Sequence, residues 1–230
     1  NNGQVGPRGA APVIGVPGRI GKGVTLNGTT DTIIVPDHQS LDNGVITIAA
    51  WVNLDDPLRR TIIAKSVDGM ATGGWVFHIY DNNGQPKLAF SVGPNAHDAS
   101  SSPPDAPSGL RVVGLNTLPT GQWIHVAATY DGSYAKVYVN GQPDGTSALL
   151  ANQLQANNEP VSIGLRQDAN GGQRDPDSHP GQTNERFFKG TIDDVNMWSY
   201  ALTPQEIQTL YNSAPPLQAN ELVIVNGDGR

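Results

Sequence analysis

One stretch near the C-terminal end, residues 187–212, limits the possible folds more than any other part of the chain. Its first part, 187–198, mixes apolar and polar residues in the manner of a half-buried strand. Its second part carries a helix start signal, in which Thr203 and Glu206 can cap each other's backbone N–H groups and Pro204 suits the first helical position. The apolar face of this helix would consist of Ile207, Leu210 and Tyr211. A single amphipathic helix must lie against another layer to bury such a face.

Short strands separated by turn residues account for most of the remaining chain. The clearest pair, 123–130 and 134–141, is joined by an Asp-Gly turn, and a second pair, 75–80 and 87–93, by an Asn-Gly turn. Further strands are predicted at 22–26, 32–35, 46–54, 61–66, 161–166 and, near the C-terminal end, 221–225. Many short strands and one late helix predict an all-β fold, an antiparallel β-sandwich.

The charge and composition of the 230 residues argue against several classes of protein. Lys and Arg number 14 against 21 Asp and Glu, and this net charge of −7 argues against nucleic acid as a partner. Cysteine is absent, which rules out disulfides and thiolate metal sites. No apolar run approaches the roughly 20 residues that span a bilayer. The chain starts at Asn1 without a signal peptide, so we expect a mature or excised segment.

Two motifs resemble those of a known superfamily. W-I-H-V-A-A-T-Y-D-G (123–132) with K-V-Y-V-N-G (136–141) is similar to the central hairpin of the laminin-G-like, or concanavalin A-like, jelly rolls. G-T-I-D-D-V-N-M-W (190–198) is similar to their closing strand, and V-N-M-W in particular resembles pentraxins, a close subgroup. The resemblance covers the core at 24–212 and implies an antiparallel β-sandwich, a jelly roll with one short C-terminal helix. We expect a single domain over 1–214 and a tail or linker over 215–230.

The resemblance to pentraxins implies a calcium site. In that subgroup an Asp-Asn pair at one hairpin and a Glu-Gln-Asp run before a long loop ligate calcium. Asp81-Asn82 match the first position, and Gln167-Asp168 match the end of the second. Arg166 stands where the run would have its glutamate, and this cation opposes a doubly charged ion. The alternative interpretation is that Asp81 and Asn82 only shape a turn.

A second calcium site is implied by carbohydrate-active jelly rolls more widely. In these proteins an Asp of the closing strand often holds a cation near the N-terminal strand, and Asp193 occupies the matching position. A carboxylate in an otherwise apolar strand needs a partner, because burying it alone is costly. Asp31 and backbone carbonyls near the N-terminus could complete the cage. The alternative is that Asp193 faces solvent or bonds to a turn.

A glycan-binding face is predicted from the alternation in W-V-F-H-I-Y (75–80). If Trp75, Phe77 and Ile79 pack inside, their strand neighbours point onto the outer face of the sheet. The long polar loops 94–111 and 167–185 could border a groove there, since loops of this length are more often functional than idle. The candidate ligand-binding residues are therefore His78, Tyr80, His97, Asp98, Arg166 and Arg174. The alternative is that they only cover a solvated sheet.

The sequence matches none of the catalytic patterns that we compared for this fold. The acid motif of laminarinase-type hydrolases, E-x-D-x-E, has no match, because the four glutamates are isolated. Asp193 and Asp194 are adjacent and would point to opposite faces of a regular strand. A retaining hydrolase needs its two carboxyls about 5 Å apart on one face. The five histidines show no metal-binding spacing.

These observations predict a non-catalytic carbohydrate-binding, lectin-like module that contains calcium. We expect it to be secreted, extracellular or at the cell surface, to bind a glycan or a cell-surface glycoprotein, and to be joined to neighbouring domains of a longer chain. Two alternatives stay open. One is a protein-binding adhesion module of the laminin-G type, and the other is a polysaccharide-degrading enzyme with an unfamiliar active site.

Overall fold

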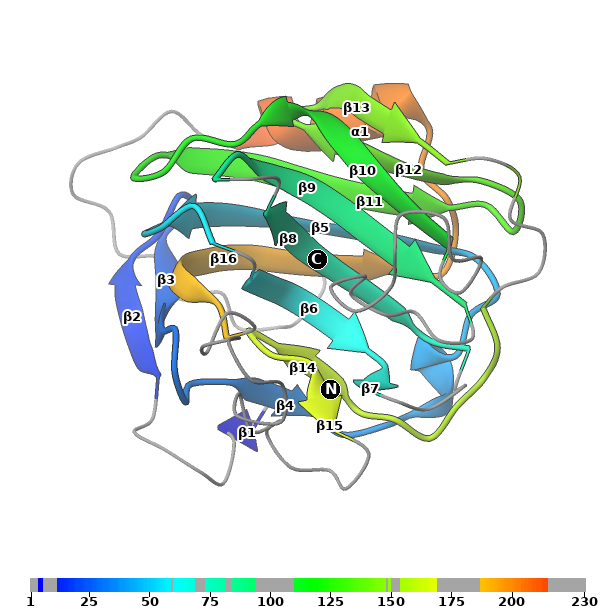
Figure 1. The fold of residues 1–230 in the computed structure, drawn as a ribbon, viewed down its shortest axis with the longest axis horizontal. Coiled ribbons are helices and arrows are strands. Elements are labelled where there is room, and N and C mark those ends of the chain that lie inside the picture. The colour runs from blue at the N-terminus through cyan, green and yellow to red at the C-terminus, as the bar shows by residue number, and fades with distance from the viewer. Residues whose placement is uncertain are drawn as a thin grey trace.

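Two seven-stranded sheets pack face to face in the computed structural model (Figure 1). The structure describes residues 4–5, 12–58, 60–68, 73–81, 84–93, 110–147, 149, 154–168 and 187–214. All strand pairs within the two sheets are antiparallel. The architecture therefore confirms the predicted antiparallel β-sandwich with one short C-terminal helix. The strand expected at 221–225 and the tail 215–230 lie outside the described residues.

The first sheet, which we call sheet A, contains the segments around the predicted ligand-binding face. Its strands follow the order β1 (Gln4–Val5), β4 (Ile33–Val35), β14 (Val161–Ile163), β6 (Arg60–Lys65), β8 (Trp75–Asp81), β9 (Pro86–Val92) and β10 (Leu110–Thr117). The hairpin β8–β9 was predicted, and β10 at the sheet edge was not. A short 3-10 helix, η1 (Gln39–Leu41), follows β4 in the chain.

The second sheet, sheet B, contains the two motifs that carry the family resemblance. Its strands follow the order β13 (Gln142–Thr146), β12 (Ala135–Val139), β11 (Trp123–Tyr130), β5 (Ile46–Leu54), β16 (Lys189–Trp198), β3 (Lys22–Asn27) and β2 (Val13–Pro17). The predicted central hairpin is β11–β12, and the predicted closing strand is β16. Two further strands, β7 (Val67–Asp68) and β15 (Gln167–Asp168), form a small parallel pair apart from both sheets.

The apolar core fills the space between the inner faces of the two sheets. Trp75, Phe77 and Ile79 of β8 all belong to it, each at most 3% exposed, which confirms the predicted alternation along this strand. Phe77 meets Phe90 of β9 edge to face, with ring centroids 6.0 Å apart. Removal of such a buried aromatic ring typically costs about 3–5 kcal/mol. The core thus fixes which side chains of β8 face outward.

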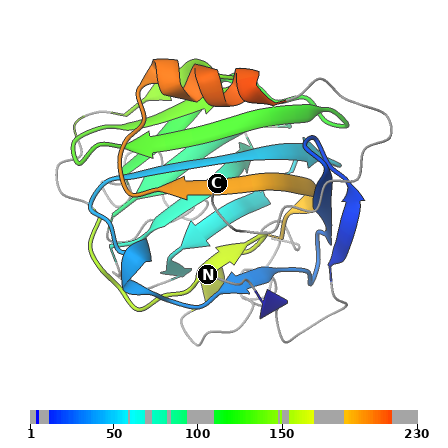
Figure 2. The same ribbon diagram turned by 180° about the vertical axis from the view of Figure 1, so that it is seen from behind.

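The C-terminal helix, α1 (Pro204–Ser213), packs on the outside of sheet B (Figure 2). Its start is the predicted capping box: the Glu206 N–H donates to Thr203 Oγ1 at 3.2 Å, and the Thr203 N–H donates to Glu206 Oε2 at 2.8 Å. Ile207 is fully buried, and Leu210 packs against the same small cluster on the sheet. No helix in the described ranges is long and apolar enough to cross a membrane.

One side of the sandwich is closed where β10 of sheet A lies against β13 of sheet B. Asp144 Oδ1 on β13 accepts a hydrogen bond of 3.1 Å from the Asn116 backbone N–H on β10. A Cβ atom at Gly114 would collide with the second oxygen of Asp144, so a glycine allows this close approach. This contact between the two edges holds β10 in place and with it the outward-facing side chains of that strand.

Candidate functional site

The outer face of β8, β9 and β10 carries the two ligand-binding residues predicted on β8. In the β8–β9 register His78 is paired with Ala89, and Tyr80 with Lys87. His78 is only 1% exposed, and its Nε2 lies 3.3 Å from Ser91 Oγ. Tyr80 is half-buried. Both side chains therefore lie on the outer side of sheet A, where His78 is covered and Tyr80 is partly accessible.

Arg111 on β10 joins Tyr80 on this face, and sequence reasoning did not find it. Its guanidinium carbon lies 4.3 Å from the centre of the Tyr80 ring, a cation–π arrangement. Leu115, farther along β10, is 75% exposed, and its carbonyl oxygen accepts a hydrogen bond of 2.9 Å from Lys87 Nζ. The sequence places Arg111 at the end of the polar loop 94–111. The β-branched pair Val112-Val113 is the local strand signal beside Arg111, and Gly114 interrupts it.

The parallel pair β7–β15 brings together acidic residues from two distant segments. Gln167 is paired with Val67, and Asp168 with Asp68. Asp68 was missed in the sequence, although the dipeptide Asp68-Gly69 is a turn signal between two strands. Gln167 and Asp168 therefore have an acidic neighbour that the sequence alone did not indicate.

Asp81 lies at the other end of β8 from this strand pair. Lys65, just before β7, is paired with Trp75 at the start of β8, whereas Asp81 is the last residue of that strand. Six residues of strand separate Trp75 from Asp81, which corresponds to roughly 20 Å. The backbone thus does not bring Asp81 to β15, and Asn82 lies outside the described residues. Calcium at this combination of residues stays a prediction.

Arg166 is almost fully buried, at 2% exposure, immediately before β15. The chain leaves β14 at Gly164, whose φ of 87° is in the left-handed region that favours glycine. Leu165 O then accepts a hydrogen bond of 2.5 Å from Ser162 Oγ, which fixes the change of direction. The other candidates from the long loops, His97, Asp98 and Arg174, lie outside the described residues.

Asp193 on β16 is buried and binds backbone N–H groups. Its Oδ2 accepts from Ile20 N at 2.7 Å, and its Oδ1 accepts from Asp194 N at 2.8 Å. Burial raises the pKa of the Asp193 carboxyl, and this effect outweighs the backbone donors that would lower it. Both oxygens already face N–H donors, which is not the oxygen-rich surrounding that calcium prefers.

Asp31 serves a different turn from Asp193. Its Oδ2 accepts from Asn27 N at 3.0 Å, at the end of β3, whereas Asp193 lies beside Gly23 near the start of that strand. Four residues of strand correspond to roughly 13 Å, so the structure does not bring the two carboxylates together. In the described ranges, no three His, Asp or Glu side chains gather in a group that could hold a metal ion.

A cage of oxygen atoms does surround one cation of the chain itself, the ammonium of Lys65. Lys65 is 1% exposed, and its Nζ lies 2.7 Å from Asp37 Oδ1 and 3.1 Å from Asp42 Oδ1. It also donates to Asn157 O and Glu159 O, each at 2.8 Å, and lies 3.2 Å from Asn157 Oδ1. Five oxygens thus surround an ammonium that has three N–H donors. The Lys65 cage ties two separate segments of the chain, 37–42 and 157–159, to the end of β6.

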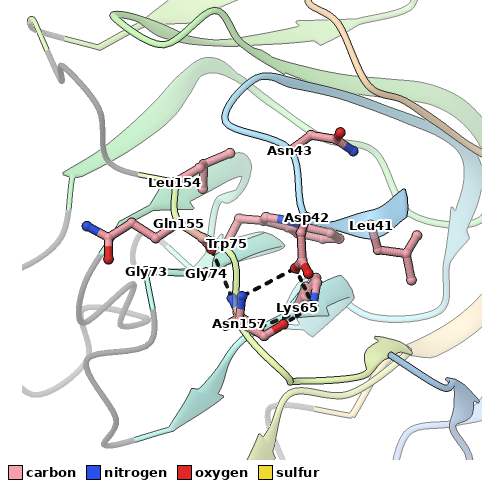
Figure 3. Close-up of a pocket in the computed structure, with 10 residues that line it drawn as sticks. All are labelled: Leu41, Asp42, Asn43, Lys65, Gly73, Gly74, Trp75, Leu154, Gln155 and Asn157. Carbon is pink, nitrogen blue, oxygen red and sulfur yellow. Dashed lines mark hydrogen bonds and ion pairs between the residues drawn. The ribbon is translucent and has the colours of Figure 1, made fainter. Parts of the chain in front are cut away.

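The Lys65 cage adjoins a small pocket at this end of the sandwich (Figure 3). The pocket is lined by Leu41, Asp42, Asn43, Lys65, Gly73, Gly74, Trp75, Leu154, Gln155 and Asn157. Its volume of about 10 Å³ is close to what one water molecule needs and far below that of ligand pockets, which are roughly 300–1,000 Å³. A sugar therefore cannot enter the pocket in this form.

His125 belongs to an aromatic cluster beneath α1 rather than to a metal site. It is paired with Trp51 on β5, with ring centroids 5.2 Å apart, and Tyr211 of α1 lies 6.0 Å from it. Burial lowers the pKa of His125 to about 4. The guanidinium of Arg19 lies over the Trp51 ring at 4.7 Å. These contacts agree with the structural role expected for His125.

Comparison with protein families gives one match that covers most of the chain. The model described as "Concanavalin A-like lectin/glucanases superfamily" matches residues 27–208. Among curated proteins, serum amyloid P-component of Mesocricetus auratus is 32% identical over 109 residues, which are 46% of this chain and 42% of that protein. C-reactive protein of Oryctolagus cuniculus is 30% identical over 89 residues, which are 38% of this chain and 36% of that protein. The matched segment thus spans less than half the length of these relatives.

Two solved structures share the fold over most of their length. A heptameric SAP-like pentraxin from Limulus polyphemus aligns with a TM-score of 0.62 at 19% identity, covering 85% of this chain and 84% of that one. The second is domain 4 of a GH43 extracellular arabinanase from Geobacillus stearothermophilus, in complex with arabinotriose. It aligns with a TM-score of 0.60 at 23% identity and covers 88% of this chain and 82% of that one. Both likenesses concern the fold alone.

Proposed function

The chain belongs to the concanavalin A-like lectin/glucanase superfamily, and from that premise we propose that it is a non-catalytic carbohydrate-binding module. The ligand would lie across the outer face of β8, β9 and β10. One structural observation supports this location: the half-buried ring of Tyr80 lies on that face, with the exposed Leu115 nearby on β10. An aromatic ring with apolar neighbours matches the apolar side of a sugar ring.

The arabinanase domain supports the same proposal, since a domain of this fold is in complex with arabinotriose there. That domain is one part of a larger extracellular enzyme, which agrees with a module attached to further domains. We propose that the present chain likewise works outside the cell or at its surface. Its partner would be a free glycan or the glycan of a cell-surface glycoprotein.

Calcium is part of this proposal, at the strand pair β7–β15. The residue types there, with Asp68 paired to Asp168 and Gln167 next to it, supply the carboxylate and amide oxygens that calcium prefers. The donors around Asp193 do not fit the ion in this way, because they are backbone N–H groups. A calcium ion at β7–β15 would hold the two distant segments together and neutralise their charge.

Binding of the folded protein to a panel of neutral and charged glycans, with and without EDTA, tests the proposal. Tyr80→Leu should weaken binding about tenfold, since a lost aromatic contact is worth about 1 kcal/mol or more. Tyr134→Leu is the matched control, because Tyr134 is an exposed ring, at 40%, in the turn between β11 and β12 of the other sheet. Absence of binding to every glycan in the panel would overturn the proposal, and a protein captured instead would favour an adhesion role.

A further inference from the structure

We propose that the outer face of β8, β9 and β10 selects anionic glycans, with Arg111 as the residue that pairs with their carboxylate or sulfate groups. This inference rests on the proposed function and names the class of glycan. It begins from the charge of the three strands. They contain one acid, Asp81 at the end of β8, against the two cations Lys87 and Arg111. Within a chain of net charge −7, these three strands thus carry a local excess of cations.

Within the described residues, neither cation has a carboxylate partner. The ion pairs in the described ranges involve Arg60, Lys65 and Lys189, and neither Arg111 nor Lys87 takes part in one. The Lys87 ammonium donates to a neutral acceptor, the Leu115 carbonyl. A patch whose cations have no carboxylate partners within the described part of the chain is complementary to an anion from outside.

Arg111 in particular has hydrogen-bonding capacity left over. Its Nη1 is buried and has no acceptor within the described residues. Leaving a buried donor unsatisfied is costly, and an anion would remove that cost once the atoms that cover Nη1 had moved aside. The planar fork of a guanidinium matches the two oxygens of a carboxylate or sulfate, which an ammonium cannot do. Arg111 is therefore the specific contact, and Lys87 adds positive charge nearby.

The Tyr80 ring lies against the guanidinium of Arg111. With the guanidinium carbon 4.3 Å from the ring centre, the ring limits the side-chain conformations of the arginine before a ligand arrives. The half-buried Val113 and the exposed Leu115 follow Arg111 along β10, whose register with β9 shifts between Val113 and Thr117. They provide an apolar surface on which the uncharged part of a sugar ring can rest. Charge and apolar surface thus lie side by side, as an acidic sugar requires.

The decisive comparison uses ligands that differ only in charge. Affinities of the wild-type protein are measured for polygalacturonate and its fully methyl-esterified form, and for dextran sulfate and dextran. We expect about tenfold tighter binding to the charged member of at least one pair, with an affinity that falls as salt is added. The carboxylate pair and the sulfate pair tell the two sources of negative charge apart. Equal binding of the charged and neutral members of both pairs would overturn the inference.

Arg111→Gln and Arg111→Lys test the residue itself. The glutamine should remove the preference for the charged ligand, and the lysine should retain only part of it, because it keeps the charge but not the planar fork. Lys136→Gln on β12 of sheet B is the control, since it changes the net charge equally but lies on the other sheet. If Lys136→Gln and Arg111→Gln lost the preference for the charged ligand to the same extent, the effect would be one of overall charge, and the proposed role of Arg111 would be wrong. Thermal unfolding of each variant verifies that it is folded.

The inference and the proposed function fail in different ways. If the wild-type protein binds neutral glycans and Arg111→Gln binds them equally well, the module is a glycan binder and the anionic preference is wrong. If the folded wild-type protein binds no glycan, charged or neutral, the proposed function itself is wrong.

Discussion

His125 and Asp193 lie on opposite sides of Trp51 in one row across sheet B, His125 from β11 and Asp193 from β16. Both are buried, at 3% and 6% exposure, and both have a shifted pKa whose largest cause is that burial. Burial favours the neutral form of each, so the histidine loses its proton more readily and the aspartic acid keeps its proton longer. The two groups therefore give the stability of the fold opposite dependences on pH.

His125 should make the fold less stable in mild acid. Its folded pKa of about 4 lies below the unfolded value of 6.5, so the unfolded chain binds the extra proton between these two values. Unfolding free energy should fall by the order of 3 kcal/mol as the pH drops through this window. Urea denaturation of the wild type and of His125→Gln measures the effect. If the unfolding free energy of the wild type changed as little with pH as that of His125→Gln, the prediction would be wrong.

Asp193 should act in the opposite direction. Its folded pKa is raised above 3.8, so its contribution is fully present below that value and is lost as the pH rises through the folded pKa. The difference in unfolding free energy between the wild type and Asp193→Asn should therefore shrink as the pH rises from acid to neutral. Asp194→Asn is the control, because Asp194 is exposed and its φ of 48° suits asparagine. If the difference in unfolding free energy between the wild type and Asp193→Asn grew as the pH rose, the predicted direction would be wrong.

Lys65→Met should strongly destabilise the protein. The change leaves Asp37, Asp42 and the surrounding carbonyl oxygens without their shared cation, and breaking a buried ion pair costs about 3–5 kcal/mol. Lys136→Met, a half-buried lysine on β12, should change the unfolding free energy by about 0.5 kcal/mol at most. Chemical denaturation compares the two variants. A loss below about 1 kcal/mol in Lys65→Met would mean that the Lys65 cage contributes little.

Calcium should stabilise the protein through β7 and β15. At about 100 times its dissociation constant, a ligand that binds only the folded state raises the unfolding free energy by about 2.7 kcal/mol. Asp68→Asn and Asp168→Asn should each reduce this gain, whereas Asp193→Asn should retain it. Thermal unfolding with calcium and with EDTA provides the measurement. If Asp193→Asn alone lost the gain, the ion would belong to β16 instead.

Thr203→Ala should weaken the start of α1. The hydroxyl of Thr203 accepts the Glu206 N–H, and loss of such a cap costs about 1 kcal/mol. Thr209→Ala, at an exposed position inside the same helix, removes a hydroxyl without removing the cap and should cost little, since alanine is the better helix former. Urea denaturation compares the two variants. If both lost the same unfolding free energy, the capping box would contribute no more than an ordinary helix position.

The parts of the fold that were predicted from sequence depend on short-range patterns. The hairpins β8–β9 and β11–β12 are joined by turn dipeptides, and the start of α1 is encoded in the four residues Thr203 to Glu206. In each case the residues that decide the structure are within a few positions of one another. These elements can therefore be predicted without knowing which distant parts of the chain they contact.

The strands that were missed are held by distant partners. Gly114 and Asn116 interrupt the apolar pattern of β10, and both are explained by Asp144, 28 residues from Asn116, on the other sheet. β2 lies in a Gly- and Pro-rich lead-in, where Pro17 is tolerated because the strand is at the edge of sheet B. The local sequence of β10 and β2 therefore does not predict a strand, and both strands form because of contacts with distant residues.

The candidate sites were predicted only in part for the same reason. The strand expected over 161–166 ends at Ile163, because Gly164 turns the chain so that Gln167-Asp168 pair with Val67-Asp68. Nothing local to either segment indicates this pairing. Tyr80 could be assigned to the outer face because that assignment needs only strand alternation, whereas its contact with Arg111 requires the register of a third strand.

The ammonium of Lys65 differs from a bound metal ion in that it is covalently attached to the chain. It has no dissociation constant, so neither dilution nor a chelator can remove it. The corner of the molecule formed by Asp37, Asp42 and Asn157 should keep its shape in calcium-free media. Any loss of glycan binding in EDTA would then report on an exchangeable ion elsewhere, with this corner serving as an internal reference.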